Sequence, residues 1–276
     1  MDDTILTMTA IFIITTLYLF ALGTAVGSFV NVVIYRTIEG GQWIKGRSHC
    51  DHCQRNLPWY DLIPLISYFY LGGKSRCCHQ PLSISHPVIE LITGSLFVWW
   101  YWFGFLFFHL SEGFRFIQPL FWLIVGVLLL IILLIDWWYM LIPDWAVYAL
   151  TGLSFIYRVS LTWNQIMQFP DFVNTLAATG VVGLLFWGLW FFTRGRGMGY
   201  GDVKLVIPLG LLLGFPKLMV GVFLSFVIGA SYGVVLMLMK RAKLKQAVPF
   251  GPFLILGSLI ALIWGEKILS WYLGWL

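Results

Sequence analysis

This 276-residue sequence has few charged residues. Asp, Glu, Lys and Arg together make up 11% of the residues, whereas hydrophobic residues make up 60%. An ordinary soluble domain has about half apolar and about a quarter charged residues. The composition therefore excludes an ordinary soluble protein and indicates a chain whose apolar surface faces lipid.

A basic flank is missing ahead of the first apolar run. The opening residues, MDDTILTM, are acidic, and the apolar run that begins near residue 9 is long. A cleavable secretory signal has a basic flank and a short apolar core. We therefore expect a retained first transmembrane helix.

Apolar runs of about 18 residues or more predict membrane-spanning helices. Eight candidate spans are predicted at 9–33, 87–109, 117–136, 142–160, 173–193, 202–214, 217–239 and 250–273. The sixth is short for a bilayer about 30 Å thick, so either its neighbours bury it or it begins partway into the membrane. The expected fold class is an all-α polytopic membrane protein with about eight transmembrane helices.

One long polar segment, 34–86, interrupts the apolar runs, and we find no internal repeat and no low-complexity tail. The segment contains all four cysteines. The predicted organisation has three parts. They are a first transmembrane helix at 1–33, a small cysteine-containing, zinc-finger-like subdomain at 34–86, and a transmembrane core at 87–276.

The net charge of +5 does not indicate a nucleic-acid partner, because the basic residues follow the loops. Four alternate loops together contain 13 of the 17 Lys and Arg residues: 34–86 has six, 137–141 has none, 194–204 has three and 240–249 has four. Cytoplasmic loops carry the excess of basic residues. We therefore expect these loops to face the cytoplasm and both termini to face the periplasm, with attraction to anionic lipid head groups as a second effect.

Two acidic residues stand at the ends of apolar runs on the predicted cytoplasmic side. Asp136 follows the run LLLIILLI, and Asp202 follows the glycine-rich turn GMGYG. A single acid at a helix start is often an N-cap, and Asp202 alone is equally consistent with that role. Acids near a membrane core are costly and are functional candidates. If packing brought the two together, repulsion and desolvation would keep one protonated, as in aspartic proteases.

Three other residues near these acids have structural alternatives. Asp144 follows Pro143, an arrangement typical of a helix cap. Lys204 could tune a neighbouring carboxylate or contact substrate, but a boundary lysine that reaches for lipid head groups is favoured. Glu90 is a candidate for capture of a basic substrate segment, and equally a first-turn acid that complements the helix dipole.

The cysteines are Cys50, Cys53, Cys77 and Cys78. On the reducing cytoplasmic side a metal is favoured over disulfides. Cys50-x-x-Cys53 has the spacing of one half of a structural zinc site, and a segment of about 50 residues usually needs such a staple. The second half, KSRCCHQ, departs from the pattern, so Cys77 or His79 could supply a fourth ligand beside Cys78. Free thiols without metal are the alternative.

Several blocks resemble the bacterial type IV prepilin peptidases, a family of intramembrane aspartic proteases with a Gly-x-Gly-Asp signature. In chain order they are GSFVNVVIYR (27–36), SHCDHCQRNLPWYDLIPLISYFYLGGK (48–74), SHPVIELITG (85–94), IDWWYMLIPD (135–144), GMGYGDVKL (197–205) and PFGPFLILG (249–257). The match runs nearly end to end. By this resemblance Asp136 and Asp202 are the catalytic pair, Gly199 and Gly201 support them, and Asp144 is not credited with catalysis.

The resemblance also implies a substrate, a second activity and a cofactor. The substrate would be a prepilin or pseudopilin, cleaved after glycine between a short basic leader and a hydrophobic helix at the cytoplasmic face of the inner membrane. The new N-terminal amine would then be methylated with S-adenosylmethionine. The family's third cysteine aligns with Ser75 and its fourth with Cys78, so Cys50, Cys53 and Cys78 are the surest zinc ligands.

Three competing hypotheses remain open from the sequence. The chain could be a peptidase that lacks methyltransferase activity, because its cysteine pattern is altered. A proton-coupled transporter would use membrane acids as a relay, but it would place them near the midplane and often shows a repeated architecture. A non-catalytic scaffold of a secretion machine is disfavoured by the presence of both acids. The pathway served and the oligomeric state are not predicted.

Overall fold

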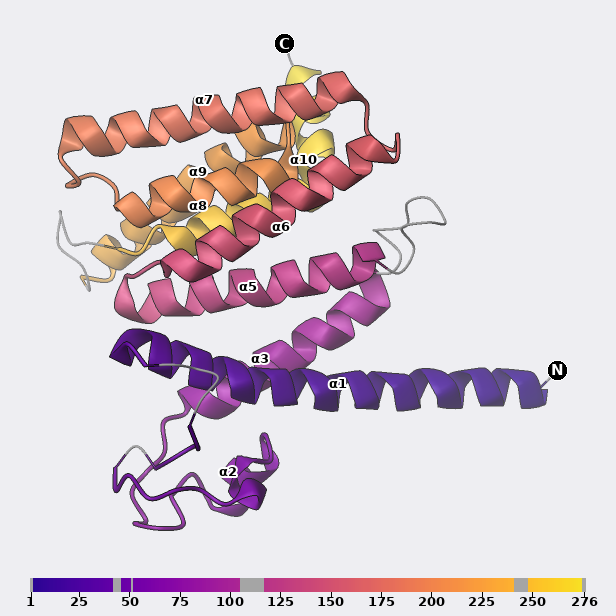
Figure 1. The fold of residues 1–276 in the computed structure, drawn as a ribbon, viewed down its shortest axis with the longest axis vertical. Coiled ribbons are helices and arrows are strands. Elements are labelled where there is room, and N and C mark those ends of the chain that lie inside the picture. Colours follow the sequence, from indigo (N-terminus) through magenta and orange to yellow (C-terminus); the bar gives the residue numbers. More distant parts are fainter. Residues whose placement is uncertain (1, 42–45, 51, 105–116, 241–247, 275–276) are drawn as a thin grey trace. The chain divides into compact units, whose positions relative to one another are not determined.

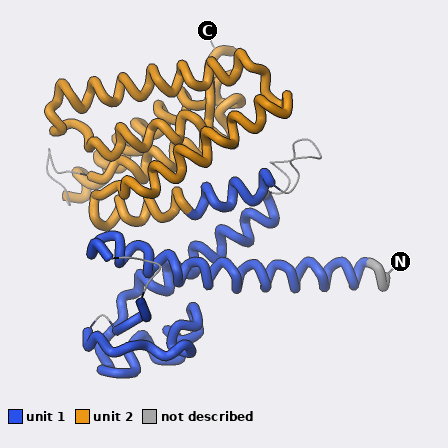
Figure 2. Tube along the Cα trace, viewed as in Figure 1, with its two compact units in different colours: residues 1–127 blue, residues 128–276 orange. Residues whose placement is uncertain are grey.

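The computed structural model describes residues 2–41, 46–50, 52–104, 117–240 and 248–274. Within these ranges the regular elements are helices, accompanied by two isolated β-bridges, His49 with Asn56 and Lys74 with Pro81. The chain divides into two compact units, residues 1–127 and 128–276 (Figure 2). Each unit is described by itself below.

Unit 1 is built on two helices that cross in close contact, α1 (Asp2–Glu39) and α3 (Ser85–Trp99) (Figure 1). Glycines permit the approach. A Cβ on Gly23 would lie 2.8 Å from the Cα of Gly94, and a Cβ on Gly27 would lie 2.7 Å from the Cα of Glu90. Such spacing of small residues lets helix backbones meet in membrane proteins. The segment GTAVG therefore fixes where α3, and Glu90 with it, lies against α1.

The remainder of unit 1 is less regular. A single π-helical turn, η2 (Trp100–Gly104), continues α3, and the first part of α5 (Ile117–Tyr139) also belongs to the unit. Between α1 and α3 lie a 3₁₀ turn, η1 (Trp59–Leu62), and the short helix α2 (Ile66–Tyr70). The polar segment therefore forms loops and short turns, as its composition indicates.

The described part of unit 2 contains the end of α5 and five further helices. These are α6 (Asp144–Trp163), α7 (Phe169–Thr193), α8 (Tyr200–Leu213), α9 (Lys217–Leu238) and α10 (Gly251–Leu273). Helix α8 packs against α6, α7, α9 and α10, and most of its side chains are buried (Figure 1). At 1.5 Å per residue its 14 residues span only about 21 Å. The alternative that its neighbours bury this short helix is confirmed.

Helix α8 ends on a half-buried cation from α6. The guanidinium of Arg158 donates hydrogen bonds to the carbonyl oxygens of Leu211 (2.6 Å) and Leu212 (2.8 Å). The last carbonyls of a helix have no partner within the helix, and a cation there also complements the helix dipole. Arg158 therefore fixes the far end of the helix whose first turn carries Asp202.

Each predicted span coincides with a helix in the described residues, although residues 105–109 of the second lie outside them. Among the described residues, five helices are long and apolar enough to cross a membrane: Ile5–Glu39, Ile117–Tyr139, Phe169–Thr193, Lys217–Leu238 and Gly251–Leu273. The expected all-α polytopic class is confirmed. The spans assigned to α3, α6 and α8, and the three-part division at 33 and 86, stay predictions.

Candidate active site

Asp136 lies in the last turn of α5, four residues before the chain turns. The backbone N–H of Met140 donates to the Asp136 carbonyl (2.9 Å), and Met140 then adopts a positive φ of 53° that ends the helix. The Asp136 side chain is buried, with 5% of the residue exposed. Its Oδ2 atom has no hydrogen-bond partner among the described residues. A buried carboxylate oxygen without a hydrogen-bond partner costs free energy, because buried polar atoms are normally paired. Oδ2 is therefore free to accept a hydrogen bond from a ligand.

Asp202 is the third residue of α8, and it is also buried, with 6% exposed. The N-cap of the helix is Gly199, which has extended backbone angles, so the alternative that Asp202 itself is the N-cap is wrong. The backbone amide of Gly199 faces the Asp202 carboxylate. A carboxylate at the third helical position that reaches back to the N-cap amide is the acidic half of a capping box. The glycine-rich turn thus orients Asp202 through the backbone.

The two acids lie close enough for their charges to repel each other. One side chain, Ile142, connects their surroundings. A Cβ on Gly201 would lie 3.0 Å from Ile142 Cβ, and a Cβ on Gly251 would lie 3.3 Å from Ile142 Cδ1. The chain therefore brings Asp136 and Asp202 into one buried site, walled by Ile142 and by two glycine backbones.

Gly251 is a site residue that sequence reasoning missed. It is the first residue of α10, and its backbone amide faces the Asp136 carboxylate. A Cβ at this position would stand 2.5 Å from Asp136 Oδ2. The block PFGPFLILG carried a signal, since a glycine between aromatic and proline residues at a helix start often marks a close backbone approach. Only the fold shows that the group approached is Asp136.

Asp144 and Lys204 form an ion pair beside this site. Asp144 is the first residue of α6, but the N-cap is Pro143 and no side chain caps the helix, so the predicted capping role of Asp144 is wrong. The Asp144 side chain is 56% exposed, in contrast to the two buried acids. Lys204 also lies over the ring of Tyr200 (5.0 Å to the centroid). Its ammonium group therefore contacts Asp144 and Tyr200 within the protein, whereas the sequence favoured a lysine that reaches for lipid head groups.

The cysteine segment contains a repeated backbone pattern that sequence reading did not find. The amide of Cys50 bonds the carbonyl of Arg55, and the amide of Gln54 bonds the carbonyl of Cys50. Twenty-five residues later, Ser75 bonds Gln80 and His79 bonds Ser75 in the same way. Both turns carry a residue with positive φ, Gln54 (57°) and His79 (56°). The segment is therefore a pair of matching turns of the knuckle type.

The repeat assigns each cysteine its place. Cys53 and Cys78 occupy equivalent positions, whereas Ser75 occupies the position equivalent to Cys50. Both Cys50 and Ser75 are buried. A second Cys-x-x-Cys would have its cysteines at positions 75 and 78. Cys77 is therefore an additional thiol, at the position equivalent to His52.

All four thiols nevertheless meet. The sulfur atoms of Cys50, Cys53, Cys77 and Cys78 lie within 4.8 Å of one another. Cys50 Sγ lies 3.8 Å from Cys78 Sγ, and Cys53 Sγ lies 3.0 Å from Cys77 Sγ. Ser75 Oγ contacts both Cys50 Sγ (3.2 Å) and Cys77 Sγ (3.0 Å). His79, the alternative fourth ligand, is not part of this cluster of described side chains.

The thiols differ in acidity. Burial raises the pKa of Cys50, but hydrogen bonds from the Ser75 hydroxyl, from two backbone amides and from the Cys77 thiol outweigh it and bring the pKa to about 6. The hydrogen bond with Cys77 raises the pKa of Cys53 to about 11. Cys50 therefore loses its proton more readily than Cys53, and the thiolate is the form of sulfur that binds a metal.

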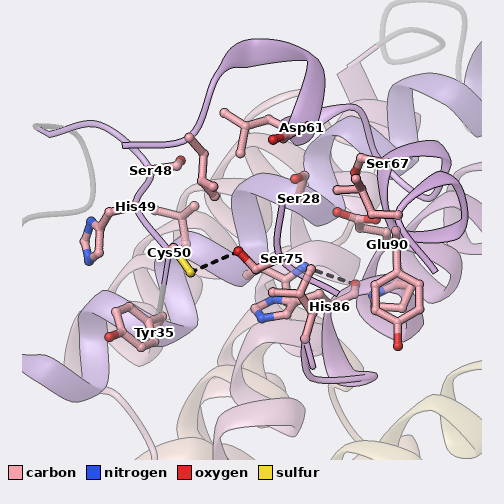
Figure 3. A pocket seen from close by; sticks show the side chains of 18 of the residues that line it. Ser28, Tyr35, Ser48, His49, Cys50, Asp61, Ser67, Ser75, His86 and Glu90 are labelled. Carbon is pink, nitrogen blue, oxygen red and sulfur yellow. Dashed lines mark hydrogen bonds between the residues drawn. The ribbon is translucent and has the colours of Figure 1, made fainter. Parts of the chain in front are cut away.

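Glu90 belongs to unit 1. It is the sixth residue of α3 and not in the first turn, so the alternative that it complements the helix dipole there is wrong. Its Oε2 accepts a hydrogen bond from the backbone N–H of Leu65 (2.8 Å). The side chain lines a cavity between α1, α3 and the cysteine segment (Figure 3). Its predicted part in leader capture stays a prediction.

Comparison with known proteins decides the family. Residues 21–103 match the family model described as Bacterial Peptidase A24 N-terminal domain, and residues 123–234 match the Type IV leader peptidase family. The chain belongs to the type IV leader peptidase family. The second match includes both Asp136 and Asp202. The resemblance drawn from the sequence blocks is confirmed.

Individual relatives match over nearly their whole length. A prepilin leader peptidase/N-methyltransferase of Aeromonas hydrophila is 31% identical over 284 residues, which cover 93% of this chain and 92% of the relative. Relatives with the same name from Legionella pneumophila and Bacillus subtilis (strain 168) are each 31% identical, and the alignments cover 92% and 96% of them. No solved structure gave a significant match.

Proposed function

We propose that this multi-pass membrane protein is an aspartic endopeptidase that removes the leader from prepilins or pseudopilins. The observation that carries the proposal is the pairing of two buried acids, Asp136 and Asp202, from helices far apart in the sequence. The names of the relatives supply the substrate class. Burial of a like-charged pair is costly, and aspartic proteases use such a pair.

The proposed mechanism needs one of the two carboxyl groups ionised and the other protonated. One carboxylate takes a proton from a water molecule as the water oxygen bonds to the scissile carbonyl carbon. The protonated partner donates its proton toward the carbonyl oxygen. Collapse of the tetrahedral intermediate breaks the C–N bond, and the leaving amine takes up a proton from the pair. The unpaired Oδ2 of Asp136 is the atom suited to hold the water.

The proposed orientation places this site at the cytoplasmic surface of the inner membrane. Asp202 lies in the region 194–204, one of the loops that contain most of the basic residues, and cytoplasmic loops carry such an excess. Asp136 shares its site with Asp202 and therefore lies at the same surface. Both termini then face the periplasm. The hydrophobic helix of the substrate would stay in the membrane, with its leader on the cytoplasmic side, so the cleaved bond would meet the acids at that depth.

N-methylation is the proposed second activity, and it rests on the names of the relatives. The new N-terminal amine attacks the methyl carbon of S-adenosylmethionine. An N–C bond forms, the S–C bond breaks with its electron pair on sulfur, and the amine releases a proton. The same names make a peptidase without this activity, or a proton-coupled transporter, the less favoured alternatives.

A zinc ion bound by Cys50, Cys53, Cys77 and Cys78 is the proposed structural cofactor. Four thiolates are the donor set that zinc prefers, and a tetrahedron with Zn–S bonds of about 2.3 Å has edges of about 3.8 Å. The 3.8 Å between Cys50 and Cys78 matches that edge. Ser75, which replaces a cysteine in the repeat, would hydrogen-bond two of the bound sulfurs. The ion would cross-link the turn that contains Cys50 and Cys53 to the turn that contains Cys77 and Cys78.

The proposal is tested by mass spectrometry of a prepilin incubated with the purified protein in detergent. We expect loss of the leader without the donor, and a further gain of one methyl group with S-adenosylmethionine. Leader loss without methylation would support the peptidase alone. A prepilin that stays intact beside a correctly folded protein would contradict the proposed substrate class.

A further inference from the structure

The side chain of Ile142 lies between the surroundings of the two acids. It belongs to the short linker between α5 and α6. On one side it packs along Gly201, the residue before Asp202: a Cβ on Gly201 would lie 3.0 Å from Ile142 Cβ, 3.1 Å from Cδ1 and 3.2 Å from Cγ1. On the other side its Cδ1 methyl approaches Gly251. The residue is partly exposed, so Ile142 borders the site and is not sealed within the core.

The linker that carries Ile142 has little freedom to move. Met140, near its start, has a positive φ of 53°, and its N–H is bonded to the Asp136 carbonyl (2.9 Å). Pro143, at its end, is buried and restricts the residue before it to extended conformations. Isoleucine is also β-branched, which limits rotation about χ1. Ile142 is therefore a stiff wall that does not swing aside for a substrate.

This wall lies close to the oxygen that is proposed to hold the attacking water. The Cβ that Gly251 lacks would stand 3.3 Å from Ile142 Cδ1 and 2.5 Å from Asp136 Oδ2. Carbon atoms in favourable contact are about 3.5–4.0 Å apart. The Cδ1 methyl and Oδ2 are thus so near each other that a single methyl group would press on both. A substrate group that reaches Oδ2 therefore comes close to the isoleucine.

The substrate residue before the scissile bond is the one that this wall affects most. Its α carbon is bonded directly to the attacked carbonyl carbon, about 1.5 Å away. The water between that carbon and Oδ2 has to stay within about 2.6–3.2 Å of the carboxylate. On the other side of the bond, the amide nitrogen separates the next α carbon from the carbonyl. A side chain on the preceding residue is therefore brought nearest to the walls of the acid pair.

We propose that Ile142 is the specificity-determining residue that restricts the position before the scissile bond to glycine. This inference rests on the proposed leader cleavage. The family resemblance implies cleavage after glycine but assigns no residue to that preference. An α carbon without a side chain fits beside the Cδ1 methyl, whereas the methyl of alanine would collide with it. Gly201 contributes by giving the isoleucine room, since a side chain there would push Ile142 into the site.

Cleavage of two prepilins that differ in one residue tests this assignment. One has glycine before the scissile bond and the other has alanine, and both are offered to the purified full chain in detergent. The variant is Ile142→Val, which removes the Cδ1 methyl and keeps the β-branched side chain. Ile156→Val, at a 66% exposed isoleucine of α6, is the matched control. The readout is the ratio of kcat/KM for the two prepilins, because general damage to the fold lowers both values and leaves their ratio unchanged.

The expected result is a change of preference. The unsubstituted protein should prefer the glycine prepilin about 100-fold, within the range that one methyl group gives in a tight site. Ile142→Val should lower that preference about tenfold, through faster cleavage of the alanine prepilin. A second variant, Ile142→Ala, removes every atom beyond Cβ and should lower the preference further and admit serine at the same position. Ile156→Val should keep the ratio of the unsubstituted protein.

Three results would contradict this assignment. An unchanged preference in both Ile142 variants, with the glycine prepilin still cleaved, would refute Ile142 as the determinant. Equal cleavage of both prepilins by the unsubstituted protein would show that the site sets no such limit. Loss of both cleavages in both variants, at the Tm of the unsubstituted protein, would make Ile142 a support of the acids instead. If the folded, unsubstituted protein cleaves neither prepilin, the proposed function itself fails, and this inference fails with it.

Discussion

Gly251 lies directly against the carboxylate of Asp136. A Cβ on Gly251 would stand 2.5 Å from Asp136 Oδ2 and 3.3 Å from Cγ, and the backbone amide of Gly251 faces the same carboxylate. Real Cβ atoms do not approach other atoms so closely, so any larger residue here must move the acid. The start of α10 is thus part of the proposed active site, although it carries no titratable group.

Gly251→Ala is expected to lower the rate of leader cleavage about 100-fold, because displacement of a reacting group by about 1 Å has that effect. The cleavage rate under single-turnover conditions is the measurement. Gly152→Ala in α6 is the control, since a Cβ there meets nothing within 4 Å. Equal rates for Gly251→Ala and the unsubstituted protein would show that Asp136 does not need this close contact.

Asp144→Asn is expected to change little. The ion pair with Lys204 is largely exposed on the Asp144 side, and exposed pairs contribute only about 0–1 kcal/mol. Cleavage should stay within about threefold of the unsubstituted rate, since the carboxamide can still accept a hydrogen bond from Lys204. A loss of cleavage as large as that expected for Asp136→Asn would give Asp144 a direct role in the chemistry.

The metal content of cysteine variants tests the proposed ligand set. The unsubstituted protein is expected to hold about one zinc ion per chain, and Cys77→Ser to lose most of it, because three thiolates remain. Ser75→Ala should keep the ion, since the hydroxyl is not a ligand. The measurement is elemental analysis of protein purified without added metal.

A swap of two side chains sharpens that test. Ser75→Cys combined with Cys77→Ser moves the fourth thiol to the position equivalent to Cys50 in the repeat. This double variant is expected to regain the zinc that Cys77→Ser alone loses. Full zinc content in Cys77→Ser would contradict the participation of Cys77, and zinc-free unsubstituted protein would contradict the site as a whole.

Arg158→Ala is expected to destabilise unit 2. The substitution leaves the carbonyl groups of Leu211 and Leu212 without their donor, and each unsatisfied buried group costs about 1–3 kcal/mol. We expect the free energy of unfolding to fall by about 2–4 kcal/mol, seen as a lower Tm in detergent. Arg196→Ala, at an exposed arginine of the α7–α8 turn, is the control. An unchanged Tm for Arg158→Ala would exclude Arg158 as the support of α8.

The positions of the helices were predictable from the sequence because lipid-facing helices are continuous apolar runs. Each predicted span overlaps a helix, and the runs that hold Asp136 and Asp202 end or begin as expected. Their pairing was not predictable from the pattern, since a helix that is apolar all round does not reveal its rotation. The pairing entered as an implication of the family resemblance, and the contacts of Ile142 with Gly201 and Gly251 now account for it.

Other parts of the site depend on contacts that no residue pattern displays. Gly251 was missed because the sequence shows a glycine but not the carboxylate that approaches it. The repeat of the two cysteine turns was missed because only Cys53 with Cys78 and Leu57 with Leu82 are identical between residues 48–57 and 73–82. Its signal lies in backbone hydrogen bonds, which different side chains can share.

The most direct test of the proposed function is leader cleavage by Asp136→Asn and Asp202→Asn, each beside Asp171→Asn at the exposed start of α7. Each of the first two is expected to lower the single-turnover rate by at least about 10²–10⁴-fold, because neither half of the acid–base pair can replace the other. All three variants should keep the Tm of the unsubstituted protein within a few degrees. Cleavage by either Asp136→Asn or Asp202→Asn at a rate near that of Asp171→Asn would contradict the two-carboxylate mechanism.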